Sequence, residues 1–222
     1  MTSSAVVDSD VLQKLTLYGL IVEFRGALES LAEIGILGAA RFMVRRAITR
    51  SAEEAKAKLS SEFEEFLELV MNLEPTEEEI DLATRMEELA NREALGFDAG
   101  ESQLCAIAIV RGIASVVTGD KRAIEAAEAM LKLEPALAEL SGRLVCLEQL
   151  MQGIISQVGI AHVRSKVCAL KGIDTTLSIC LKCWYPGIPN DSEIADAFKS
   201  YINDLRNKAP NLLSGGYSFP NS

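Results

Sequence analysis

Two short apolar runs of the chain each end on an aspartate. Residues 5–7 lead directly into Asp8, and residues 114–118 lead through one glycine to Asp120. Brief runs of this kind, rich in β-branched residues, are typical of buried parallel strands. Parallel strands bring their carboxyl ends to one edge of a sheet, and ligands bind at that edge in open α/β sheets. The sequence therefore predicts that the two acids meet there, in a place suited to Mg²⁺ or Mn²⁺.

Composition narrows the classes of function. The chain has 222 residues and a formal net charge of −10, which disfavours a general electrostatic attraction to phosphate. Any contact with nucleic acid then needs a local basic patch or a metal ion. The longest apolar stretches are interrupted well before the roughly twenty residues that a membrane span requires. We therefore expect a soluble protein without a membrane partner.

The five cysteines are scattered through a chain whose first residues lack the pattern of a secretory signal. This predicts a cytoplasmic protein with reduced thiols. Cys180 and Cys183 have the spacing of a zinc knuckle, and His162 and Cys168 lie in the same part of the chain. The apolar neighbours of Cys180 favour the alternative of buried, inert thiols.

Hydrophobic periodicity and helix-start signals predict strands that alternate with helices over residues 1–148, which is typical of a parallel sheet. Residues 149–222 show helical segments only, and this predicts a division into an α/β domain and an all-helical C-terminal extension. The expected elements are helices over 11–37 meeting near Gly19 or Gly26, a strand or helix at 41–44, helices opened by capping boxes at Ser51 and Thr76, a helix at 104–110, a strand before Asp120, a strand at 143–147, and helices at 150–170, 175–183 and 192–208.

Three acidic motifs occur in order along the chain: Asp8-Ser-Asp10 after the first run, Asp98-Ala-Gly-Glu101 at a helix start, and Thr118-Gly-Asp120. Over about residues 5–147 this arrangement resembles the PIN-domain family of metal-dependent nucleases, in particular the members with a Gly-Glu helix start. The resemblance implies a PIN-like fold, in which a parallel central sheet is flanked by helices. It also implies a hydrolase that cleaves RNA with Mg²⁺ or Mn²⁺.

Carried over to this sequence, the resemblance assigns Asp8, Glu101 and Asp120 as catalytic metal ligands, with Asp10 and Asp98 as auxiliary ligands. Hard divalent cations take oxygen ligands, so a few carboxylates at a fixed edge are enough to bind one. A metal-activated water is then the expected nucleophile. Each acid also has a structural alternative, because Asp8 and Asp120 can cap helices and Glu101 can face a helix dipole.

The sequence departs from the family pattern after the second strand. Families of this type usually have another acid at the start of the next helix, where this chain has Arg41, Arg45 and Arg46, and Glu54 is better explained as part of a capping box. Arg45 and Arg46 could contact substrate phosphates, or they could form the polar face of a helix. Thr118 matches a position that often carries a hydroxyl in the family, so it is a further substrate candidate.

The missing acid and the negative net charge support a second hypothesis. In this alternative the chain is a catalytically inactive PIN-like protein that serves as an interaction or scaffold module for a protein partner. Metal binding separates the two hypotheses, because a ligand that binds the native state must stabilise it.

Overall fold

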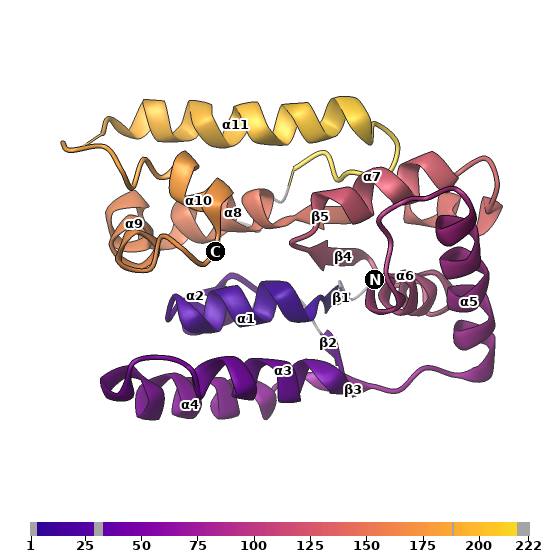
Figure 1. The fold of residues 1–222 in the computed structure, drawn as a ribbon, viewed down its shortest axis with the longest axis horizontal. Helices are drawn as coiled ribbons and strands as arrows, with labels where there is room; N and C mark the ends of the chain where they lie inside the picture. The colour runs from indigo at the N-terminus through magenta and orange to yellow at the C-terminus, as the bar shows by residue number, and fades with distance from the viewer. Residues whose placement is uncertain (1–3, 29–32, 188, 217–222) are drawn as a thin grey trace.

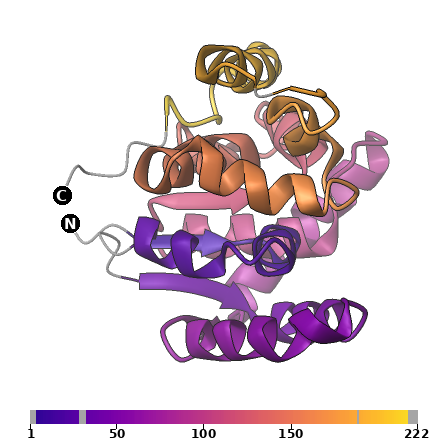
Figure 2. The same cartoon turned by 90° about the vertical axis from the view of Figure 1, so that its left-hand side faces the viewer.

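The computed structural model describes residues 4–28, 33–187 and 189–216. Its centre is a five-stranded sheet of order β3-β2-β1-β4-β5, in which every pairing is parallel. Helices cover both faces of this sheet (Figures 1 and 2), so the predicted α/β class is confirmed. The strands are β1 (Ser4–Val7), β2 (Glu33–Leu37), β3 (Met71–Leu73), β4 (Ser115–Thr118) and β5 (Leu144–Cys146).

Strands β1, β4 and β5 alternate their side chains between two apolar cores, one on each face of the sheet. Val7 and Val117 point into the core formed with α1 to α4 and α8 to α11. Val6 and Val116 point into the core formed mainly with α5, α6 and α7. The helices are α1 (Ser9–Leu17), α2 (Ile21–Leu28), α3 (Gly38–Ile48), α4 (Glu53–Leu67), α5 (Glu77–Arg92), α6 (Ala99–Val110), α7 (Lys121–Met130), α8 (Leu147–Val158), α9 (Ile160–Ala169), α10 (Thr175–Cys180) and α11 (Asp191–Lys208), with a short 3₁₀ helix, η1 (Pro135–Leu140).

The second strand lies earlier in the chain than the sequence suggested. Residues 41–44 belong to α3, and β2 is formed by Glu33–Leu37, within the segment that was expected to be helical. Strand β3 was not predicted at all. The two errors are linked, because Gly35 of β2 lies against Leu73 of β3: a Cβ at position 35 would lie 2.6 Å from Leu73 Cδ1. A glycine that a strand needs for close packing weakens the apolar pattern by which strands are recognised.

One of the two predicted capping boxes is present. Thr76 and Glu79 cap α5 reciprocally, as expected. The box at Ser51 is wrong, because α4 has Ala52 as its N-cap residue and no side chain caps it. The Ser51 hydroxyl instead donates a long hydrogen bond to the carbonyl of Ala47 at 3.5 Å.

The predicted helix at 150–170 is interrupted at Gly159, which has a φ of +83° and separates α8 from α9. Helix α8 begins at Leu147 and so runs across residue 148, where we placed the domain boundary. Leu150 of α8 and Phe198 of α11 share a core with Val7 of the central strand. The division into 1–148 and 149–222 stays a prediction.

The prediction that all five cysteines are reduced is wrong for one pair. Cys168 and Cys183 form a disulfide, with their Cα atoms 4.9 Å apart, because the end of α9 lies beside the turn that follows α10. Cys180 is buried as expected, and Cys105 and Cys146 are also free and buried. Within the described ranges, no helix has both the length and the apolar character needed to cross a membrane.

Candidate acidic site

Asp8 stands at the junction of β1 and α1. Its backbone N–H donates to the carbonyl of Val117 (2.9 Å), which holds it beside β4. Although Asp8 occupies the N-cap position of α1, its side chain makes no well-formed capping hydrogen bond, and it accepts from the Ser9 hydroxyl (3.2 Å). Burial, followed by the nearby Asp10 carboxylate, raises the pKa of Asp8 to about 6. The capping alternative therefore does not account for this acid.

Glu101 is fixed by a reciprocal capping box at the start of α6. Its backbone N–H donates to Asp98 Oδ1 (2.9 Å), and its Oε2 accepts from the N–H of Asp98 (2.8 Å). Burial raises the pKa of Glu101 to about 7, and the carboxylates of Asp98, Asp120 and Asp8 act in the same direction. The three acids assigned from the sequence are therefore close enough to influence one another electrostatically.

Asp120 is held by an arginine two residues away. It caps α7 by accepting from the N–H of Arg122 (2.8 Å), and the Arg122 guanidinium donates to both of its carboxylate oxygens (3.2 and 2.8 Å). Burial acts to raise the pKa of Asp120. The contacts with Arg122 outweigh this effect and hold the pKa of Asp120 below its usual value. Thr118 lies just before this turn, and its hydroxyl accepts from the N–H of Asp120 (3.1 Å). Thr118 before Asp120 and Arg122 after it thus both hold the turn that follows β4.

Asp10 is already paired with a lysine. Lys14, one turn further along α1, lies 2.6 Å from Asp10 Oδ2 and 2.8 Å from Asp174 Oδ2. Gly119 permits this arrangement, because a Cβ at that position would overlap the Asp10 carboxylate. Asp10 is therefore less available to a metal ion than Asp8.

Asp98, Glu101 and Asp120 line one cavity of about 360 Å³, together with Arg122. The donor chemistry suits a divalent cation, because Asp8 and Glu101 are largely buried carboxylates that make no salt bridge within the part of the chain that the structure describes. In the same described part, however, no three side chains among His, Cys, Asp and Glu are gathered closely enough to hold an ion. The hydrogen bonds of Asp120 to Arg122 are one physical reason.

The three arginines of α3 lie in different surroundings. Arg45 makes a bidentate ion pair with Glu64 (2.8 and 2.7 Å) on the outer surface, as expected for a polar helix face. Arg46 lines a separate groove that is described below. Arg41 lies in the first turn of α3, where the resemblance led us to look for an acid, and its Nε is buried without a hydrogen-bond partner among the described residues.

Sequence reasoning missed the cations around the acids. The Asp10–Lys14 spacing of four residues and the position of Arg122 beside Asp120 are signals that could have been recognised. The partners from the C-terminal helices have no such local signal. Lys121 contacts Glu148 Oε1 of α8 (2.6 Å) and Thr176 Oγ1 of α10 (3.1 Å), and only the folded chain brings these residues together.

Comparison with known proteins adds little to this picture. No family model matches the chain, and no curated protein matches it. Among solved structures, the chain is similar to VapBC2 from Rickettsia felis, crystallised with a DNA fragment from its promoter, with a TM-score of 0.45 and 14% identity. The match covers 64% of this chain and 96% of the other chain. A likeness at this level carries no argument about family or function.

Proposed function

We propose that the chain is a PIN-like, divalent-metal-dependent endoribonuclease that hydrolyses phosphodiester bonds at the acidic site. The observation that carries the proposal is the state of Asp8. Its carboxylate is largely buried, does not cap its helix and makes no salt bridge in the described part of the chain. Burying such a charge without compensation is unfavourable, so its position is best explained by a cation that binds there.

The arrangement of the acids supports a phosphodiesterase. Asp8 and Asp120 follow the adjacent strands β1 and β4, and Glu101 approaches from the start of α6. Asp8 and Glu101 would hold Mg²⁺ or Mn²⁺, and Asp120, now paired with Arg122, would be a further ligand. When bound, the cation would lower the pKa of the attacking water and neutralise charge that develops on the phosphate.

The protein's own side chains would perform the remaining tasks. Arg122, once released from Asp120, is placed to donate to a substrate phosphate, as guanidinium groups do well. Asp98 would keep Glu101 in position through the capping box. Asp10 and Thr118 would position the loops that carry Asp8 and Asp120, whereas Arg46 lines a separate groove and has no part in this proposal. An RNA substrate implies a cytoplasmic location, which is part of the proposal.

The test is cleavage of a fluorescent single-stranded RNA in the presence of Mn²⁺. We expect Asp8→Asn and Glu101→Gln each to reduce the cleavage rate by about a hundredfold or more, because each removes a charged ligand. Asp81→Asn is the matched control: Asp81 is an exposed acid of α5, and its loss should leave the rate unchanged. Absence of Mn²⁺-dependent cleavage, or equal loss in the control, would refute the proposal.

A second function has its own support. Cations already occupy two of the acids, since Arg122 pairs with Asp120 and Lys14 pairs with Asp10. Arg41 also stands where the resemblance leads one to expect an acid. These features favour the alternative of an inactive PIN-like interaction module. Under that alternative Mn²⁺ would not stabilise the protein, and RNA would remain intact.

A further inference from the structure

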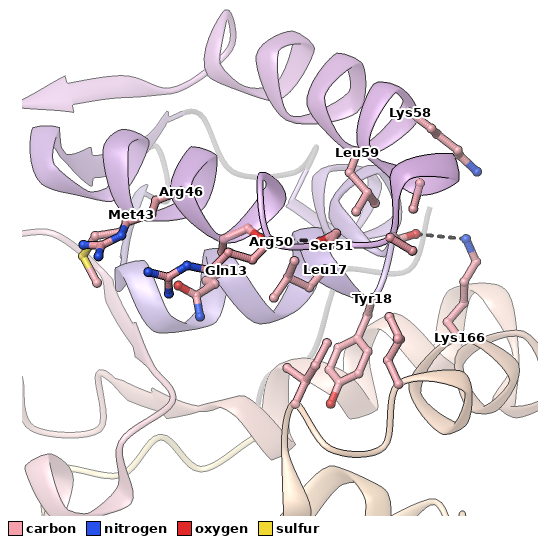
Figure 3. A pocket seen from close by; sticks show the side chains of 16 residues that line it. Gln13, Leu17, Tyr18, Met43, Arg46, Arg50, Ser51, Lys58, Leu59 and Lys166 are labelled. Carbon is pink, nitrogen blue, oxygen red and sulfur yellow. Dashed lines mark hydrogen bonds between the residues drawn. The ribbon is translucent and has the colours of Figure 1, made fainter.

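A groove of about 840 Å³ lies at the opposite end of α1 from Asp8. Its walls come from the end of α1, the turn between α3 and α4, and the region from α9 to α10 (Figure 3). The nine helical rises from Asp8 to Leu17 span about 13.5 Å, and the groove shares no lining residue with the cavity beside Asp98, Glu101 and Asp120. The groove is therefore a separate feature from the acidic site.

Positive charge surrounds this groove. Its lining residues include the cations Arg46, Arg50, Lys58 and Lys166, and none of them is an aspartate or glutamate. Arg46 and Arg50 make no salt bridge within the described part of the chain. Lys58 pairs with Glu62 at 3.6 Å, and Lys166 donates to the carbonyl of Gly19 (3.1 Å). On a chain with a net charge of −10, such a basic groove selects an anionic ligand.

The first turn of α4 adds hydrogen-bond donors to the same groove. Ala52 and Ala55 both line it, and Ala52, the N-cap residue, has no side chain that could cap the helix. The leading N–H groups of a helix need acceptors, and they attract anions together with the helix dipole. The first turn of α4 also holds Glu53 and Glu54, and the N–H of Ala55 already donates to the carbonyl of Ala52 (3.0 Å), so the cationic side chains carry most of the attraction for an anion.

The floor of the groove indicates which class of anion fits. It is formed by aliphatic and thioether side chains, and two of these, Met43 and Leu170, are each 47% exposed. The only aromatic residue in the lining is Tyr18, which is 3% exposed and cannot offer a ring face. Single-stranded nucleic acids usually rely on stacking against aromatic rings. An aliphatic floor with a cationic rim is better matched to a peptide.

We propose that the groove is a docking site for an acidic, aliphatic-rich peptide segment of a partner protein. Aliphatic side chains of the segment would pack on Met43 and Leu170. Its carboxylates would contact Arg46 and Arg50. This mode combines two known means of peptide recognition, apolar anchors in a groove and acidic motifs held by arginines. The proposal is independent of metal binding and of RNA cleavage.

A selection from a random peptide library displayed on phage tests the proposal. The wild-type protein is the target, and the Arg46→Glu/Arg50→Glu variant is used to remove peptides that bind elsewhere. The recovered peptides are then synthesised with a fluorescent label, and their dissociation constants are measured by anisotropy. The matched control is Lys132→Glu/Lys199→Glu, which changes the charge equally at exposed positions outside the groove.

We expect peptides rich in Asp or Glu and in Leu or Ile. Their affinity should fall by about tenfold or more in Arg46→Glu/Arg50→Glu and in Leu170→Glu, and should stay unchanged in the control. Recovery of no peptide that depends on the two arginines would overturn the proposal. A labelled oligouridine that binds the wild type and loses affinity in the same arginine variant would also overturn it, because the groove would then be a nucleic-acid site.

Discussion

The ammonium group of Lys14 lies 2.8 Å from a carboxylate oxygen of Asp174, which joins the helix that follows Asp8 to the loop before α10. Both side chains are mostly buried, with exposed fractions of 14% and 13%. Lys14 also contacts Asp10, and Lys121 makes a second connection to the C-terminal helices through Glu148. These two ion pairs hold the C-terminal helices against the loops that carry Asp8 and Asp120.

Asp174→Ala should therefore destabilise the whole fold. Asp174 also caps α10 by accepting from the N–H of Leu177 (2.8 Å), so the substitution removes a cap and leaves Lys14 with only one partner. We expect the free energy of unfolding to fall by about 2–3 kcal/mol, as measured by urea denaturation. Asp191→Ala, at an exposed position in α11, is the control. A loss below about 0.5 kcal/mol for Asp174→Ala would show that the connection contributes little.

Arg122→Ala tests whether the arginine competes with a metal ion for Asp120. The substitution removes both guanidinium bonds, so Asp120 Oδ2 becomes free and Oδ1 keeps only the capping bond from the backbone N–H at position 122. Mn²⁺ should then bind several-fold more tightly, since a negative ligand becomes available, and this is measured by calorimetric titration. Arg85→Ala removes a comparable surface pair with Glu134 and should leave the affinity unchanged. Equal affinities for the wild type and Arg122→Ala would exclude competition.

The acidic site should make the protein less stable as the pH rises. The pKa values of Asp8 and Glu101 are raised to about 6 and about 7 from their ordinary values of 3.8 and 4.5. Between about pH 4 and 7, Asp8 and Glu101 thus keep protons in the native state that they have lost in the unfolded chain. The stability that these protons contribute is lost as the pH rises through that range. Thermal melts should show this decline, with a smaller slope in Asp8→Asn. If stability falls with pH as steeply in Asp8→Asn as in the wild type, Asp8 does not have the raised pKa.

Two glycine substitutions form a matched pair that tests the packing of β2. Gly35→Ala places a Cβ 2.6 Å from Leu73 Cδ1 in the sheet, and we expect a loss of about 1–3 kcal/mol in the free energy of unfolding. At Gly26, in α2, a Cβ meets no atom within 4 Å, and alanine favours a helix by up to about 1 kcal/mol. Urea denaturation should therefore show that Gly35→Ala lowers the free energy of unfolding and that Gly26→Ala raises it. A neutral Gly35→Ala would mean that β3 moves to accommodate the methyl group.

Much of the fold could be predicted because its signals are local. The apolar runs before Asp8 and Asp120 form β1 and β4, and the capping box at Thr76 begins α5 as expected. The position of β2 could not be predicted in this way, because Gly35 is required by a contact with Leu73 from a distant segment. Short strands of this kind are recognised by their partners more than by their own sequence.

The candidate site likewise combines features that local sequence patterns predict with contacts that they do not predict. The sequence order of Asp8, Glu101 and Asp120 predicts a site at the carboxyl edge of the sheet, and Asp8 and Asp120 do follow the adjacent strands β1 and β4. Local helix-start signals also indicate the position of Glu101. The partners that decide the charge state of the acids, above all Asp174 for Lys14, come from far along the sequence. The basic groove is likewise formed by three separate segments. Tertiary contacts, and not local patterns, determine these features.

The most direct test of the central claim is calorimetric titration of Mn²⁺ at about pH 7.5, where both raised pKa values are exceeded, into the wild type, Asp8→Asn and Asp81→Asn. If Asp8 holds a cation, the wild type and Asp81→Asn will bind Mn²⁺ with the same affinity, and Asp8→Asn will lose that binding. If the wild type binds no Mn²⁺, or if Asp8→Asn binds it equally well, the acidic site is not a metal site.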